Sequence, residues 1–172
     1  MQDVRLKPAL FDRLCDDAPG ERLEAARKRY TTAQELRESV VRDLGWLLNS
    51  VRLSAVQDLA DYPLAARSVL NFGLPDLSGR TLSSIDIPEL EAEMRQAILD
   101  FEPRLMPESL RVAVYDNQDN QQAVGPNSLQ FTIEAKLIAH PLPLAMWLRT
   151  EIDLETGDVS VAEWNRDAAS RA

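Results

Sequence analysis

The sequence predicts an α+β fold, with N-terminal helices packed on a C-terminal antiparallel sheet of about four strands. Up to Phe101 the apolar residues recur at helical spacing, whereas from Leu110 onward they alternate with polar residues. Pro103 lies where the period changes, and it cannot continue a helix because it lacks an N–H. The chain has 172 residues, of which 45% are hydrophobic, so we expect one main domain, placed at residues 31–164.

The two ends of the chain are interpreted separately from this domain. Residues 1–30 form an N-terminal docking segment or extension, and residues 165–172 a disordered tail. The apolar motif Leu10-Phe11-Asp12-Arg13-Leu14 precedes a Pro-Gly break. Either this motif is a frayed end or a short helix packed on the domain, or Phe11 and Leu14 anchor it on another protein.

The first long helix is expected to begin near Thr32. Thr32 and Glu35 have the spacing of a capping box, in which each side chain bonds to the other residue's backbone N–H. The charged residues that follow, Arg42 and Asp43 among them, are assigned to the solvent side. The predicted core stripe consists of Leu36, Val40, Leu44, Leu47 and Val51, widened by Val41 and Leu48.

A short helix is expected after Asp61-Tyr62, because Pro63 suits the first turn of a helix. This helix would carry Leu64, Val69 and Leu70. Residues 71–79 then contain two glycines and a proline, which predicts a loop. The apolar members of that loop, which we expect to pack on the core, are Phe72, Leu74 and Leu77.

The second long helix is expected to begin after Asp86 and to end at Phe101. Asp86 and Glu89 repeat the capping spacing, with Pro88 in the first turn. The residues predicted to face the core are Leu90, Met94, Ala97, Ile98 and Phe101.

Four strands are expected after this helix. They comprise residues 110–115, 129–138 and 146–154 and a short strand at Val159 and Val161. A polar loop at 116–127 separates the first two, and Glu155-Thr156-Gly157-Asp158 forms a hairpin turn before the last. The unpaired edges of such a sheet offer places where a partner strand can add.

The composition excludes several classes of function. The net charge is −9, and residues 51–172 hold ten basic and nineteen acidic residues, so no nucleic-acid partner is expected. No apolar run reaches the roughly 20 residues of a membrane helix, and no secretory signal is evident, which favours a cytoplasmic protein. His140 is interpreted as a loop residue and Cys15 as a buried or inert thiol, so we expect no metal site. No cofactor motif is present, and none is expected.

The corner Glu102-Pro103-Arg104 permits three interpretations. Glu102 could be the acid of a glycoside hydrolase, with Asp100, Glu108 or Asp116 as the second carboxylate. However, the neighbouring cation favours an ionised carboxylate, whereas a general acid must carry a proton. Alternatively, Glu102 and Arg104 form a surface ion pair that stabilises little, or Arg104 offers its planar fork to a protein partner.

A succession of motifs connects the chain to a known family. The residues that carry it are Leu10-Phe11-Asp12-Arg13-Leu14, Arg42-Asp43-Leu44, Leu47-Leu48-Asn49, Tyr62-Pro63, Ser68-Val69-Leu70-Asn71-Phe72-Gly73-Leu74-Pro75-Asp76-Leu77, Phe101-Glu102-Pro103-Arg104-Leu105, Phe131-Thr132-Ile133, Ile152-Asp153 and Thr156-Gly157. Their order resembles that of TssE, the type VI secretion baseplate family, which is similar to the lysozyme-like wedge protein of contractile phage tails. Each motif is weak alone, and their succession is specific.

The resemblance implies a lysozyme-like baseplate wedge domain that acts structurally and is not an enzyme. Members of the family join TssF and TssG in the wedge and form the platform on which the TssB–TssC sheath begins to polymerise. TssK and the spike hub are further expected partners. The resemblance assigns Glu102, Pro103 and Arg104 to the wedge contact and the sheet to strand addition by the sheath. It places the protein in the cytoplasm, at a baseplate docked on the inner membrane, without insertion into that membrane.

Two other functions stay open. One is a peptidoglycan-cleaving glycoside hydrolase, and the other is a regulatory binding protein on the same fold. The chain also departs from the family pattern, since Phe72 occupies a position where Tyr is expected at least as often.

Overall fold

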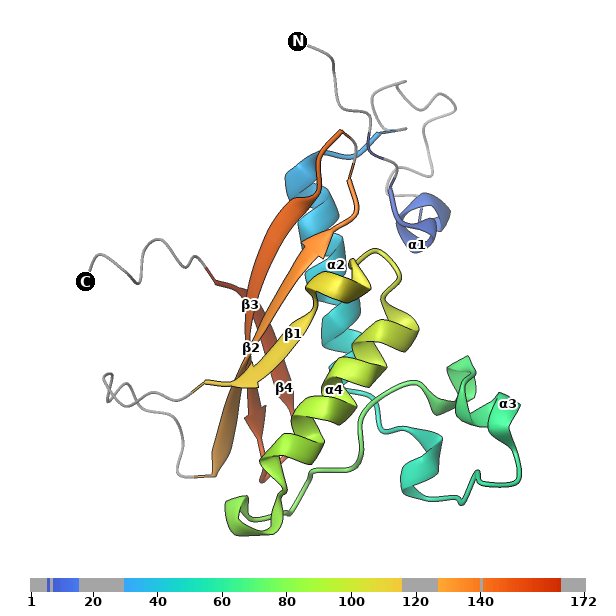
Figure 1. Cartoon of the computed structure of the whole chain (residues 1–172), viewed down its shortest axis with the longest axis vertical. Helices are drawn as coiled ribbons and strands as arrows, with labels where there is room; N and C mark the ends of the chain where they lie inside the picture. Colours follow the sequence, from blue (N-terminus) through green and yellow to red (C-terminus); the bar gives the residue numbers. More distant parts are fainter. Residues whose placement is uncertain (1–5, 7, 16–29, 116–126, 140, 165–172) are drawn as a thin grey trace, which may run out of the picture.

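Two long helices pack against one face of a four-stranded antiparallel sheet (Figure 1). The structure is a computed structural model that describes residues 6, 8–15, 30–115, 127–139 and 141–164. The strands lie in the order β1-β2-β3-β4, so each pairs with its neighbours in sequence. Their bounds are Arg111–Val114, Ser128–Leu137, Leu144–Asp153 and Val159–Glu163. The predicted α+β fold is therefore confirmed.

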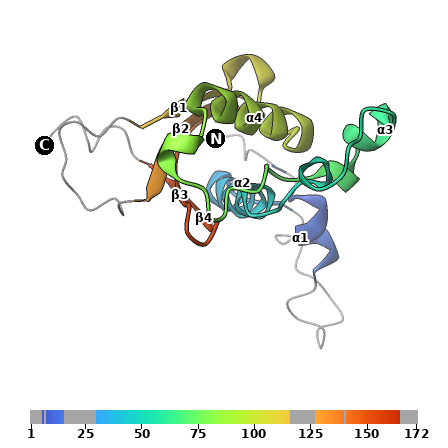
Figure 2. The ribbon, with the colours of Figure 1, turned by 90° about the horizontal axis from the view of Figure 1, so that it is seen from below.

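Four α-helices precede the sheet among the residues that the structure describes. Their bounds are Leu10–Leu14 for α1, Ala33–Leu48 for α2, Pro63–Ala66 for α3 and Ile87–Phe101 for α4. Short 3₁₀ turns occur at Leu53–Ala55, Val69–Asn71, Leu82–Ser84 and Pro107–Ser109. Seen from below, α2 and α4 lie on the same side of the strands (Figure 2), and the opposite face of the sheet has no described helix on it.

The helix α2 begins as predicted. The Thr32 hydroxyl accepts the backbone N–H of Glu35 at 3.1 Å, and the Glu35 carboxylate accepts that of Thr32 at 2.7 Å. The helix ends earlier than predicted, because the Asn49 side chain bonds both to the carbonyl of Gly45 and to the backbone of Val159 in β4. The expectation that Val51 continues the core stripe is therefore wrong, and Val51 is exposed.

The helix α4 also has the predicted bounds. Asp86 accepts the Glu89 N–H at 3.0 Å, and Pro88 lies in the first turn. The helix ends at Phe101, since Glu102 has φ −119° and ψ 76° ahead of the proline.

The core lies between these two helices and the inner face of β2 and β3. The strand alternation is as predicted, because every second residue of both strands is buried. The buried strand residues are Leu129, Phe131, Ile133, Ala135, Leu137, Met146, Leu148, Thr150 and Ile152, with Leu154 directly after β3. Long-range apolar burial of this kind is the main term that stabilises a domain of this size.

Residues 52–73 leave this body as an arm that carries α3 (Figure 1). Two backbone hydrogen bonds close the neck of the arm: Arg52 N–H to the Leu74 carbonyl at 2.9 Å, and Leu74 N–H to the Ser50 carbonyl at 2.8 Å. Gly73 is required there, because it has φ 123° and a Cβ would lie 2.1 Å from the Ser50 oxygen.

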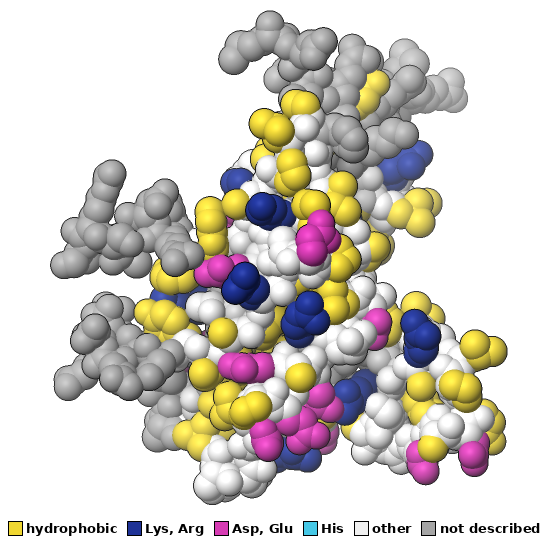
Figure 3. Space-filling view, viewed as in Figure 1, with side chains coloured by type: hydrophobic (Ala, Val, Ile, Leu, Met, Phe, Trp, Pro, Cys, Tyr) yellow, Lys and Arg dark blue, Asp and Glu magenta, His cyan; other side chains and the backbone are white. Residues whose placement is uncertain are grey.

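The arm differs from the expectation of one helix. The helix α3 ends at Ala66, and a separate turn begins where the Ser68 hydroxyl accepts the Leu70 N–H. Apolar side chains gather on the arm (lower right of Figure 3). The strongly exposed ones are Val56, Tyr62, Leu64, Val69 and Leu70. Beyond the neck, Leu74 and Leu77 are buried and Phe72 packs on the core, as predicted.

Several predictions concern residues outside the described ranges. These residues are the stretch 16–29, residues 116–126 of the predicted polar loop 116–127, His140 and the tail 165–172. Cys15 is described and is exposed, so of its two interpretations, a buried or an inert thiol, the first is wrong and the second stays a prediction. In the described part of the chain, no helix is long and apolar enough to cross a membrane. No group of three or more potential metal ligands occurs among the same residues.

Candidate functional site

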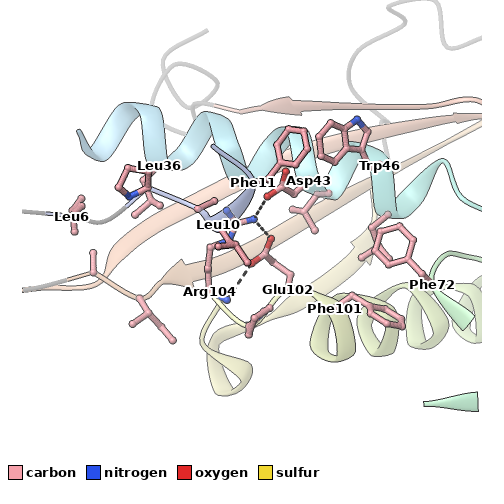
Figure 4. A pocket seen from close by; sticks show the side chains of 17 residues that line it. Leu6, Leu10, Phe11, Leu36, Asp43, Trp46, Phe72, Phe101, Glu102 and Arg104 are labelled. Carbon is pink, nitrogen blue, oxygen red and sulfur yellow. Dashed lines mark hydrogen bonds and ion pairs between the residues drawn. The ribbon is translucent and has the colours of Figure 1, made fainter. Parts of the chain in front are cut away.

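A groove of about 820 Å³ lies between α2, the end of α4 and the N-terminal segment (Figure 4). Its floor is mainly apolar and includes Leu44, Leu47 and Phe101. One wall carries the charged side chains of Asp43, Glu102 and Arg104. The groove thus combines an apolar floor with a small number of fixed polar groups, as binding sites commonly do.

Glu102 and Arg104 form the polar wall. The Glu102 carboxylate accepts the backbone N–H of Arg104 at 3.1 Å and its Nε–H at 2.7 Å, and it also accepts from Nη2. Glu102 is only 4% exposed. The interpretation as a surface ion pair is therefore wrong, and removing the cation would leave a buried carboxylate without its counter-charge.

Arg104 also connects this corner to α2. Its Nη2 donates to Asp43 Oδ2 at 2.6 Å and its Nη1 to the Ser39 hydroxyl at 3.1 Å. The assignment of Asp43 to the solvent side is wrong, because its carboxylate turns toward Arg104 at the groove wall (Figure 4). The end of α4 and the middle of α2 are thus joined through one guanidinium group.

Arg104 remains a cation in this environment. Burial acts to lower its pKa, but the hydrogen bonds and charges of Glu102 and Asp43 outweigh burial and raise the pKa above its ordinary value. Four of its five guanidinium N–H groups are used, since Nε makes one bond, Nη1 one and Nη2 two. The exposed part of the corner is Pro103.

The N-terminal segment also lines the groove. The Phe11 ring meets Trp46 edge-on at 5.4 Å, and Asp12 pairs with Arg42 at 2.6 Å. The described part of this segment is thus a short helix packed on the domain, one of the two alternatives given by the sequence. Phe11 is still 51% exposed and Leu14 75% exposed. Their role as anchors for another protein stays a prediction.

Sequence reasoning missed several members of this site. Ser39, Asp43 and Trp46 all lie on α2 and meet partners that are remote in the chain. A weak signal existed, because Ser39 and Asp43 are four residues apart and so share one helical face beside the apolar stripe.

The geometry does not favour hydrolysis. The Glu102 carboxylate is held in an ion pair, whereas a glycosidase acid must be protonated. Of the proposed second carboxylates, Asp100 accepts a hydrogen bond from Gln96 on α4, Glu108 is exposed, and Asp116 lies outside the described residues. Asp43 and Glu102 both pair with Arg104. These two carboxylates of the groove wall therefore do not form an acid pair that is free of a cation.

One comparison with known proteins gives a match. The model of the family described as "Baseplate wedge protein gp25" matches residues 34–142, from the first turn of α2 to the connection between β2 and β3. This range contains Ser39, Asp43, Glu102 and Arg104. The comparisons with curated proteins and with solved structures give no match.

Proposed function

The chain belongs to the baseplate wedge protein gp25 family, and on this premise we propose that the groove beside Glu102-Pro103-Arg104 binds other wedge subunits of a contractile baseplate. One observation carries this proposal: a buried ionic network fixes an exposed proline at the rim of an apolar groove. Such a rigid rim costs little conformational entropy when a partner binds. In this proposal Glu102 and Arg104 fix the shape of the contact surface, and the exposed Pro103 touches the partner.

We propose further that the baseplate is that of a type VI secretion system, with the chain as its TssE subunit. The groove then takes TssF and TssG, with an amphipathic segment of a partner lying on the apolar floor. The exposed apolar side chains of the arm support an assembly role, because such patches mark protein contacts. TssK and the spike hub are further proposed partners, and the complex would sit in the cytoplasm at the inner membrane.

The edge of β4 is the proposed site where the TssB–TssC sheath adds a strand. The bonds Asp153 N–H to Asp158 and Trp164 N–H to Trp147 set the pairing of β3 with β4. Because antiparallel pairs alternate, the N–H groups of Val161 and Glu163 point away from β3. On β1 the outward N–H of Val114 is instead taken by Glu91 of α4, at 2.6 Å. The β4 edge therefore offers the longer row for pairing.

We propose no catalytic step for this chain. The ion pair of Glu102 argues against acid catalysis, and the family is one of structural wedge proteins. Incubation with peptidoglycan should release no soluble fragments. Fragments released by wild type and lost in Glu102→Gln would contradict this and favour the hydrolase.

Co-purification with TssF and TssG tests the groove. Pro103→Asp adds a charge at the rim and leaves the Arg104 network in place, so it should reduce capture of both subunits at least tenfold, a loss of about 1.4 kcal/mol or more. Pro107→Asp is the matched control, because Pro107 is also exposed and begins a 3₁₀ turn nearby. Equal capture by both variants would move the contact elsewhere. No capture by wild type would contradict the assignment to TssE.

A further inference from the structure

A second cluster lies on the open face of the sheet, away from α2 and α4. The Arg149 guanidinium stacks on the Tyr115 ring at 4.2 Å and on the Trp164 ring at 5.0 Å. Tyr115 follows β1 and Trp164 follows β4, so the cluster spans the sheet from one edge strand to the other. The two rings also meet edge-on at 6.0 Å. The two rings are at 71° to each other, so they contact the guanidinium from adjacent directions and restrict its position.

The Arg149 side chain makes no hydrogen bond and no ion pair within the described part of the chain. Its Nε is buried and makes no hydrogen bond there. Three other arginines have a buried nitrogen in the same condition, but each of those side chains makes an ion pair: Arg37 with Glu163, Arg42 with Asp12 and Arg52 with Glu93. The nearest acid along the strand, Glu151, bonds instead to Gln130 at 3.4 Å. Nη1 and Nη2 make no hydrogen bond to a described residue either, so these terminal nitrogens keep their donors for an acceptor from outside.

We propose that Arg149, in contact with the rings of Tyr115 and Trp164, binds an aspartate or glutamate side chain of a protein that lies across the open face of the sheet. A carboxylate fits the planar fork with two parallel hydrogen bonds. Arginine and large aromatic residues are also the commonest hot-spot residues of protein interfaces. This surface is separate from the groove, and it uses side chains on the open face of the sheet where the β4 edge uses backbone groups, so the proposal goes beyond the proposed function.

The charge of the surroundings decides between kinds of partner. Glu134 and Glu151 lie on the same face of the sheet as Arg149, and the chain as a whole carries −9. A polyanion such as nucleic acid or an acidic membrane would be repelled by that charge. One carboxylate in an otherwise neutral segment carries a single negative charge, so it meets much less of that repulsion than a polyanion does.

NMR titration with two blocked peptides tests the proposal. Acetyl-Gly-Glu-Gly-amide should shift the Arg149 Nε–H and the Trp164 indole resonances saturably, and acetyl-Gly-Gln-Gly-amide should bind about tenfold more weakly because a neutral acceptor replaces a charged one. The indole of Trp46, on α2, is an internal control and should not move. Equal binding of both peptides, or no shift with either, would overturn the proposal. Tighter binding of inorganic phosphate than of the glutamate peptide would overturn it as well.

Two variants separate binding from a packing role. Arg149→Met keeps an apolar chain beside the rings but has no donor. The change in the Trp164 indole resonance on addition of the glutamate peptide should therefore vanish, while the circular dichroism stays unchanged. Arg149→Lys keeps the charge but loses the fork, so binding should be intermediate. Glutamate-peptide binding by Arg149→Met equal to that of wild type would show a packing role only. If Arg149→Met fails to fold, the comparison of the two peptides on the wild type still decides.

Discussion

The guanidinium of Arg104 and the carboxylate of Asp43 are 61 positions apart in the chain and 2.6 Å apart in space. The same guanidinium holds the buried Glu102. The polar wall of the groove is therefore one ionic unit built from two distant segments. Replacing any member should change the shape of the wall as well as its charge.

Arg104→Met should destabilise the fold by about 3 kcal/mol, because it leaves Glu102 buried without its cation. Arg104→Lys should cost less, since the charge stays while the fork is lost. Urea unfolding measures both. The double variant Glu102→Leu with Arg104→Met should recover part of the loss, because no unpaired charge then remains. A change below about 0.5 kcal/mol in Arg104→Met, the range of ordinary surface substitutions, would show that the network contributes nothing to stability.

Gly73→Ala should destabilise the protein by about 2 kcal/mol or more, since its positive φ is strained for alanine and the new Cβ would clash with the Ser50 carbonyl. Gly79→Ala is the matched control. Its φ is also positive, at 71°, but no atom lies within 4 Å of a Cβ there, so it should cost only about 1 kcal/mol. Thermal or urea unfolding of both variants gives the comparison. Equal losses of unfolding free energy in the two variants would mean that the clash with the Ser50 carbonyl at the neck is unimportant.

The capping box of α2 should make stability depend on pH. The backbone N–H of Thr32, helped by the hydroxyls of Thr31 and Thr32, holds the pKa of Glu35 below its ordinary value of 4.5. The folded protein therefore binds this proton less readily than the unfolded chain does. The contribution is complete above about pH 4.5 and is lost as the pH falls through the lowered folded pKa.

The variant Glu35→Gln serves as the reference for this effect. The difference in unfolding free energy between wild type and Glu35→Gln should be constant near pH 7 and should shrink toward pH 3. A difference that stays constant over this whole range would contradict the assigned pKa direction.

Val161→Pro should block sheath growth and spare capture of TssF and TssG, because it removes an N–H that points away from β3. Val112→Pro is the matched control on β1, the other edge strand, because the N–H of Val112 likewise points away from the paired strand, β2. Sedimentation of TssB–TssC tubes started from purified baseplates measures the effect. Loss of tubes in Val112→Pro alone would move the sheath site to β1.

Local sequence signals predicted the elements that depend on near neighbours. The capping spacing of Thr32 and Glu35 located the start of α2, and the alternation around Phe131 and Leu148 identified β2 and β3. Pro103 likewise predicted the end of α4 at Phe101. In each case the physical cause acts within a few residues, so it can be read from the sequence.

The features that were missed depend on distant partners. From the sequence alone Asp43 is expected on the surface, and only the folded chain brings Arg104 beside it. The early end of α2 follows from a contact between Asn49 and Val159 that no local pattern shows. Leu64 lies in the expected helix, whereas Val69 and Leu70 were wrongly assigned to it, because the chain turns at Ser68, whose hydroxyl accepts the Leu70 N–H.

The closed neck of the arm has a mechanical consequence. Ser50 and Arg52 hold both ends of the arm at Leu74, directly after α2, and Arg52 also pairs with Glu93 of α4. Asn49, one residue before that point, bonds the N–H and the carbonyl of Val159 through its side chain. A displacement of the arm would thus act on α4 through Arg52 and, through Asn49, on the first residue of the β4 edge strand. The arm and the proposed sheath-binding edge are therefore mechanically coupled.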